Sequence, residues 1–199
     1  MLLASLLLMT GGCVSTSTDV RSWIDDQTAV SATAQIRPLS FSRNDIQNGV
    51  SIVNYADVGA FEVNEAGRRS YYLSVLDWSI VTKVMTANSR TVDDFSTLTI
   101  HADDQSISLR RFTQDHAMLK LTADVFQKRL ASVNQNYYDV SIDQLMTIAH
   151  AKKLRLTAGN QNTGDTFYLS ASGEKNSSLT TFAEEVSRTA SLARPASGR

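Results

Sequence analysis

Cysteine is almost absent from this chain, since Cys13 is the only one among 199 residues. A single cysteine excludes a disulfide within the chain, a zinc site built on several cysteines, and exchange between paired thiols. Proline and glycine are also scarce, with 2 and 9 residues, so the chain is not of low complexity. Burial of a hydrophobic core must therefore stabilise the fold without covalent help.

Neither sign of charge is in excess, because 19 Lys and Arg residues are balanced by 20 Asp and Glu residues. Nucleic acid binding requires a basic surface that pairs with phosphates, and binding to anionic lipid requires clustered basic side chains. The balance argues against both kinds of partner.

The common catalytic motifs are missing as well. The chain has no Gly-x-Ser-x-Gly, no phosphate-binding Gly-x-x-x-x-Gly-Lys, no His-Glu-x-x-His, and no Ser-x-x-Lys in a credible setting. His101 and Asp103 share a face of a predicted strand beside Asp104, but a metal ion needs three or four converging ligands. We therefore expect a protein that is not an enzyme and that holds no cofactor and no metal.

No apolar run approaches the roughly 20 residues that a membrane-spanning helix needs. Residues 1–12 form a short apolar stretch that ends in two glycines, and polar residues follow Cys13 closely. This pattern predicts a secretory signal peptide over residues 1–12. No Lys or Arg precedes Arg21, and a start assigned too far downstream would account for that gap.

The motif Thr10-Gly11-Gly12-Cys13 resembles the lipobox of bacterial lipoproteins, with Thr10 where Leu is usual. The resemblance implies that Cys13 becomes the acylated, palmitate-bearing first residue of the mature protein and holds it at a membrane. Because Val14 rather than Asp follows the cysteine, it also implies the outer membrane of a Gram-negative cell, with the domain facing the periplasm. The alternative is an ordinary signal peptide cut elsewhere, with Cys13 incidental.

Composition divides the rest of the chain into three parts. Residues 13–36 are rich in Ser, Thr, Asp and Ala, and we interpret them as a lipidated N-terminus and tether that contains a weak helix over residues 23–34. Residues 37–189 are expected to form a single domain. Residues 190–199 are rich in Ala, Ser and Arg and predict a disordered tail.

Alternating hydrophobic residues predict two hairpins, one turning at Gly67 and one turning at residues 103–105. Further strands are expected around Leu154 and Phe167. Helices are predicted over residues 142–151, with Ser141 and Gln144 at capping-box spacing, and from Ser178 onward. The predicted fold is α+β, with an antiparallel sheet or small β-sandwich on which two short helices of the C-terminal half pack.

The segment from Val58 to Leu73, with Trp78 after it, is the most distinctive stretch. It is similar to a stretch in uncharacterised envelope lipoproteins of proteobacteria, a resemblance that carries no activity. Its charged and aromatic side chains are the candidate interaction residues: Glu62, Glu65, Arg68, Arg69, Tyr72 and Trp78. The alternative is a solvated hairpin with weak cross-strand ion pairs.

These observations favour a non-enzymatic interaction or structural module of the cell envelope, bound to the membrane through lipid on Cys13 and to an unidentified envelope protein. One alternative is a periplasmic lipoprotein that binds a small ligand between the sheet and the two helices. A second is a hydrolase that acts on cell-wall or lipid substrates, with His101 or His116 as the base.

Overall fold

The computed structural model describes residues 19–47, 50–81, 94–128, 133–159, 164–170 and 177–192. These residues contain ten strands: β1 (Val20–Ile24), β2 (Ser31–Gln35), β3 (Leu39–Gln47), β4 (Val50–Glu65), β5 (Arg68–Val81), β6 (Thr97–Ala102), β7 (Gln105–Thr113), β8 (Asn134–Asp139), β9 (Leu154–Ala158) and β10 (Asp165–Leu169). They also contain the 3₁₀ turn η1 (His116–Leu119) and the helices α1 (Ile142–His150) and α2 (Ser177–Leu192).

Eight of the strands close into an antiparallel barrel in the order β4-β3-β10-β9-β6-β7-β8-β5, and the pairing of β5 with β4 completes the circle. The predicted open sheet or sandwich is therefore wrong. Alternation along a strand shows that one face is buried, but a barrel interior and a sandwich core give the same alternation. Closure depends on pairing between strands far apart in the sequence, which the pattern does not encode.

One such closing contact joins β3 to β10. Among the described residues its register has two pairs, Ser42 with Tyr168 and Phe41 with Leu169, and Ser170 N donates to Ser40 O at 2.9 Å beside them. The Ser170 hydroxyl also donates to the Ser42 hydroxyl, across 128 positions of sequence. The seam is thus short and joins distant parts of the chain.

The predicted hairpin around Gly67 is confirmed. It is the longest hairpin among the residues that the structure describes. β4 and β5 stay paired from Glu65 and Arg68 at the turn to Ile52 and Val81 at the far end. The two turn residues, Ala66 and Gly67, have φ angles of 50° and 91°. Positive φ at both positions is the geometry that matches the twist of a two-residue hairpin.

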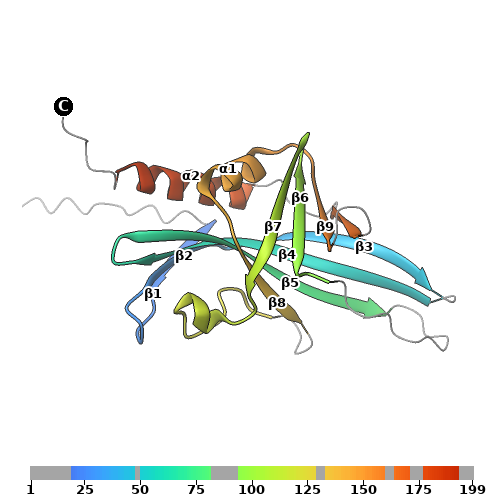
Figure 1. The fold of residues 1–199 in the computed structure, drawn as a ribbon, viewed down its shortest axis with the longest axis horizontal. Helices are drawn as coiled ribbons and strands as arrows, with labels where there is room; N and C mark the ends of the chain where they lie inside the picture. Colours follow the sequence, from blue (N-terminus) through green and yellow to red (C-terminus); the bar gives the residue numbers. More distant parts are fainter. Residues whose placement is uncertain are drawn as a thin grey trace, which may run out of the picture.

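Strand β4 is paired twice along its other edge. Its first half pairs with β3, and its second half, from Phe61 to Asn64, pairs with β2. The β1–β2 hairpin therefore extends the sheet outside the barrel (Figure 1). Residues 20–35 are strands of the folded domain, so the expected tether with a weak helix over 23–34 is wrong in this part. The small residues Ala32 and Ala34, which suggested a linker, are buried in the sheet.

Two hydrophobic cores share the β4–β5 hairpin. Inside the barrel, alternate residues such as Val58 and Val75 join the apolar faces of α1 and α2, which lie side by side (Figure 1). On the outer face, Phe61 and Leu76 join a second cluster, to which the β1–β2 hairpin adds residues of the same sheet and which residues 119–126 cover. Each face of the hairpin therefore contributes to a hydrophobic core.

Both predicted helices are present. The capping box of α1 is formed, since Ser141 Oγ accepts from Gln144 N at 3.1 Å and Gln144 Oε1 accepts from Ser141 N at 2.9 Å. The second helix begins at Ser177, one residue before the predicted start, and continues to Leu192. Among the described residues, neither helix has the length and apolar character of a bilayer span.

Candidate functional site

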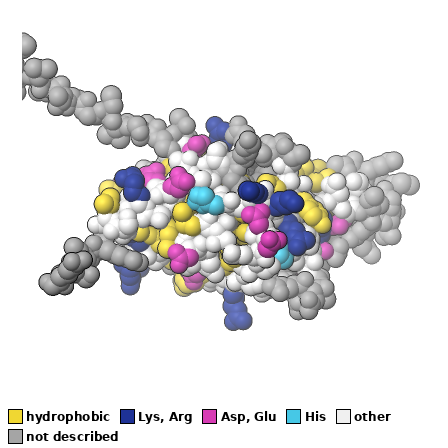
Figure 2. Space-filling model, turned by 90° about the horizontal axis from the view of Figure 1, so that it is seen from above, with side chains coloured by type: hydrophobic (Ala, Val, Ile, Leu, Met, Phe, Trp, Pro, Cys, Tyr) yellow, Lys and Arg dark blue, Asp and Glu magenta, His cyan; other side chains and the backbone are white. Residues whose placement is uncertain are grey.

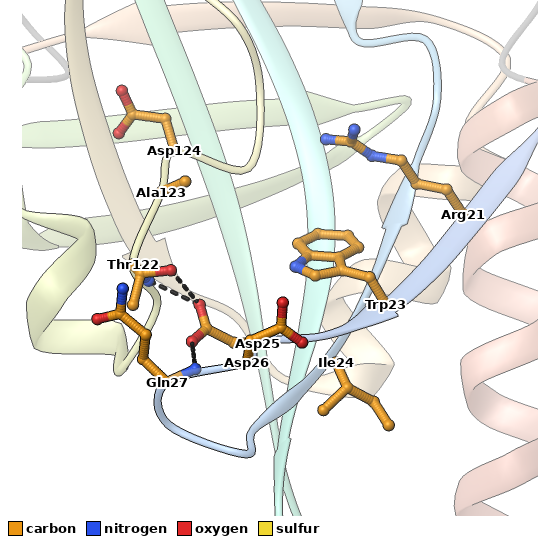
Figure 3. A pocket seen from close by; sticks show the side chains of 9 residues that line it. All are labelled: Arg21, Trp23, Ile24, Asp25, Asp26, Gln27, Thr122, Ala123 and Asp124. Carbon is orange, nitrogen blue, oxygen red and sulfur yellow. Dashed lines mark hydrogen bonds between the residues drawn. The ribbon is translucent and has the colours of Figure 1, made fainter.

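The described residues include an open groove of about 370 Å³ beside strand β1. One wall comes from β1 and the turn after it, and the other from the segment that follows η1 (Figure 3). The lining residues are Arg21, Trp23, Ile24, Asp25, Asp26, Gln27, Thr122, Ala123 and Asp124. Its volume falls within the range of small binding sites.

Asp25 joins the two walls. Its Oδ2 accepts from both the backbone N and the hydroxyl of Thr122 at 2.8 Å, and its Oδ1 accepts from the backbone N of Gln27 and Thr28 (Figure 3). These bonds, with those from Thr122 as the largest cause, hold the pKa of Asp25 well below its ordinary value. A carboxylate that is ionised and fully bonded is a structural clamp and not a proton carrier.

Asp124 is held from the opposite side of the groove. Its Oδ1 accepts from the Tyr137 hydroxyl at 3.2 Å and lies 3.0 Å from His116 Nδ1. Lys128 Nζ lies 3.5 Å from its Oδ2. Burial and the carboxylate of Asp124 raise the pKa of Tyr137, so this phenol remains a hydrogen-bond donor. The contacts fix the wall of the groove in place.

Arg21 and Trp23 stand on the β1 wall (Figure 3). The Arg21 guanidinium lies 5.0 Å from the centre of the Trp23 ring and also donates to the backbone O of Val125. Such a cation–π contact orients both side chains. With three carboxylates and one guanidinium among its lining residues, the groove is acidic overall.

Strand β1 also ends the sheet, since no other described strand pairs with its outer edge. The backbone N of Asp25 donates to Val30 O, and Ile36 N donates to Asp19 O, each at 2.8 Å. These bonds show that the backbone groups of Asp19 and Asp25 point toward the β2 side. In an antiparallel pair, residues whose backbone groups point toward the partner strand alternate with residues whose backbone groups point away from it. The backbone groups of Val20, Ser22 and Ile24 therefore face away from β2, where a further strand would lie.

The sequence-predicted interaction residues do not form one surface. Glu62, which is buried, and Arg69, which is partly exposed, make an ion pair with Arg69 Nη1 2.8 Å from Glu62 Oε1, and Arg69 also donates to the hydroxyl of Thr189 in α2 at 3.0 Å. Glu65 pairs instead with Arg68 and Lys120 at the hairpin tip. The cluster is thus divided between a contact with α2 and a contact with the segment after η1.

The two predicted aromatic residues lie on the opposite face of β5 from Arg69. Tyr72 packs 5.4 Å from Phe61 between ring centres, and Trp78 stacks on Tyr55 at 4.2 Å. Six positions along a strand span roughly 20 Å, so these two rings are not neighbours. Each is part of a packing cluster rather than of a common binding patch.

The histidines proposed as bases differ in their surroundings. His101 Nδ1 lies 2.9 Å from Ser106 Oγ and its Nε2 3.1 Å from Thr157 Oγ1. Partial burial and then the charge of Arg155 lower its pKa. In the part of the chain that the structure describes, neither His101 nor His116 is bonded to both a hydroxyl and a carboxylate, as a catalytic triad requires.

Asp103, which shares a predicted strand face with His101, lies in the β6–β7 turn with a φ of 51°. Its carboxylate accepts from the backbone N of Lys152 and Lys153, with a shortest distance of 2.9 Å. It therefore fixes the loop after α1. The described residues contain no group of three or more His, Cys, Asp or Glu side chains placed to hold a metal ion.

The predicted ligand pocket between the sheet and the helices receives no support. Leu145 and Ile148 of α1 and Phe182 of α2 are 0–2% exposed and belong to the same cluster as the barrel interior. Side chains thus fill this space in the described part of the molecule. On the face of the molecule that Figure 2 shows, acidic and basic side chains lie next to one another.

The groove was missed in the sequence because residues 13–36 were interpreted as a tether. A signal was present, since Val20 to Ile24 and Ser31 to Gln35 are strand-like runs around the polar turn residues 25–28. Comparisons with models of protein families, with curated proteins and with solved structures found no match. Geometry is therefore the basis for any functional proposal.

Proposed function

We propose that this chain is a lipid-anchored lipoprotein of the cell envelope that acts as a non-enzymatic interaction module. The observation that carries the proposal is strand β1, whose outward backbone groups border an open acidic groove. An unpaired strand edge is a common docking site for an extended segment of another protein, because backbone hydrogen bonds supply affinity and adjacent grooves supply selectivity.

The position of β1 relative to Cys13 supports a membrane-proximal role. Val20 follows Cys13 by seven residues. An extended chain spans at most about 3.6 Å per residue, so lipid on Cys13 would hold β1 within about 25 Å of the bilayer surface. The partner is therefore expected at the same membrane, and the outer membrane remains the location that Val14 implies.

Two measurements test the proposal. The intact mass of the mature protein should exceed that of the polypeptide from Cys13 by the mass of the attached acyl groups, and Cys13→Ser should abolish the increase. A mature protein cut elsewhere and without lipid would contradict the anchor.

The docking surface is tested by a photoreactive amino acid in place of Ile24, with the same replacement of Tyr168 on β10 as the control. The two side chains are similarly exposed, at 67% and 61%. We expect one defined cross-linked partner from position 24 in intact cells, and none from position 168. Equal labelling from both positions, or none from position 24, would contradict β1 as the docking element.

A further inference from the structure

We propose that the strand added to β1 is the β1 strand of a second copy of this chain, in antiparallel orientation about a two-fold axis at Ser22. The inference rests on the proposed function, since it names the partner of the same docking edge. It uses three features of the described residues: the direction of the backbone groups, the register they permit, and the side chains that this register brings together.

The backbone groups define the register. Only Val20, Ser22 and Ile24 present their N–H and C=O groups outward. Pairing Ser22 with Ser22 of the second copy places Val20 opposite Ile24 and uses all three residues of both strands. Since each such pair exchanges two hydrogen bonds, this register forms up to ~6 of them. A shift by two positions leaves outward residues of each strand without a partner.

The side chains are complementary in this register. Val20 meets Ile24 of the second copy, which covers an isoleucine that is 67% exposed in the single chain. Arg21 lies opposite Trp23 of the second copy on the groove side. Within one chain the guanidinium already lies 5.0 Å from the Trp23 ring, so the pairing places each Arg21 between two indoles. Asp25 does not oppose this, because its carboxylate is bound to Thr122.

The two-fold arrangement is compatible with two lipid anchors in one bilayer. The axis relating two antiparallel edge strands runs perpendicular to the sheet, so both copies of Asp19 lie at the same height along it. Each is six residues from its own Cys13. Two anchored copies then bind more firmly than one, because dissociation requires both lipids to leave the membrane together.

A proline at position 22 provides the first test, with the intact lipoprotein in liposomes of neutral phospholipid. Ser22→Pro removes an outward N–H and leaves the backbone bonds to β2 in place, while the hydroxyl contact with Thr33 Oγ1 is lost in Ser22→Pro and Ser22→Ala alike. We expect it to raise the dimer dissociation constant at least about tenfold, which corresponds to one or two lost hydrogen bonds. Ser22→Ala, which keeps the N–H, should form dimers as the wild type does.

A cysteine at position 22 provides the second test. Paired Cα atoms at this position would lie ~5.5 Å apart, within the ~4.4–6.8 Å range that a disulfide spans. Under mild oxidation, Ser22→Cys should yield a covalent dimer, while the exposed Ser106→Cys on β7 should not. A monomeric wild type, or a dimer that Ser22→Pro leaves intact, would overturn the inference.

The outcomes separate this inference from the proposal beneath it. Capture of a different envelope protein from position 24, without a disulfide between two copies of Ser22→Cys, would overturn the self-pairing and leave the docking role of β1 intact. Absence of both products would overturn both. Circular dichroism monitors whether Ser22→Pro remains folded. If Ser22→Pro does not fold, the formation or absence of the Ser22→Cys disulfide dimer decides whether β1 pairs with a second copy.

Discussion

The edge of the Phe126 ring occupies the space in which a Cβ at Gly59 would lie. Gly59 is on the outer face of β4, and Phe126 belongs to the segment that covers this face. Phe126 also packs edge-on against Phe61, with 6.5 Å between ring centres. The absence of a side chain at position 59 therefore lets the covering segment approach the sheet and form the second wall of the groove.

Gly59→Ala is expected to lower the free energy of unfolding by about 1–3 kcal/mol, because the ring must move out of a filled core. In a Phe126→Ala background the same change should cost much less, a coupling measurable by a double-mutant cycle in urea. Gly67→Ala is the matched control. Gly67→Ala is unfavourable because position 67 has a positive φ, and no atom lies within 4 Å of where the new Cβ would be. The cost of Gly67→Ala should therefore not depend on Phe126.

Asp25→Asn is expected to destabilise the protein and to weaken its acid sensitivity. The folded state lowers the pKa of Asp25 below its ordinary value of 3.8. The carboxylate therefore adds stability at pH values above 3.8, and this contribution is lost as the pH falls toward the folded-state pKa. Chemical denaturation between pH 3 and pH 7 measures the effect. The matched control is Asp26→Asn at the exposed neighbouring position, which should change the free energy of unfolding little. Equal changes in the two variants would contradict the role of Asp25 as a clamp.

Glu62 should have the opposite dependence on pH. Burial raises its pKa above the ordinary 4.5, while the hydrogen bond from Arg69 opposes the shift. Its contribution is thus most favourable below pH 4.5 and declines as the pH rises through the folded-state pKa. We expect the stability of the wild type relative to Glu62→Gln to fall between pH 4 and pH 8. A difference that rises with pH would show that the Arg69 contact outweighs burial.

Ser141→Ala should cost about 1 kcal/mol, because it removes the acceptor for the backbone N of Gln144 at the start of α1. Ser141→Asp keeps an acceptor there and should retain most of the stability. Thermal unfolding of the two variants measures both losses of stability. Equal losses in both would mean that the capping bond contributes little.

Local features of the fold were predictable from the sequence. The hairpin at Gly67 and the capping box at Ser141 follow from residues close together in the chain, and both are confirmed. Such features depend on turn conformation and on helix-end hydrogen bonds, which a short sequence window contains. The predictions were accurate where neighbouring residues decide the structure.

The closed barrel and the groove were not predictable in the same way. Barrel closure depends on pairs such as Phe41 with Leu169, whose distance in sequence hides them from any local pattern. The clamp between Asp25 and Thr122 also joins remote residues, 97 positions apart. Composition was also misleading for the β1–β2 hairpin, because Ser, Thr and Ala are typical of linkers but here Ala32 and Ala34 fit close-packed positions.

The short β3–β10 seam has a consequence for how the molecule assembles and opens. The β4–β5 hairpin forms from neighbouring residues, whereas the seam must bring Ser42 and Ser170 together across 128 positions and gains little pairing when it does. Closure of such a loop is entropically costly and slow. Ser170 N donates to Ser40 O across the seam, and bonded positions alternate along a strand, so the Tyr168 amide also faces β3 whereas the amides of Phe41 and Leu169 face away from the seam. The backbone amides of Tyr168 and Ser170 should therefore be among the last barrel amides protected during refolding, and the first to exchange in the native state.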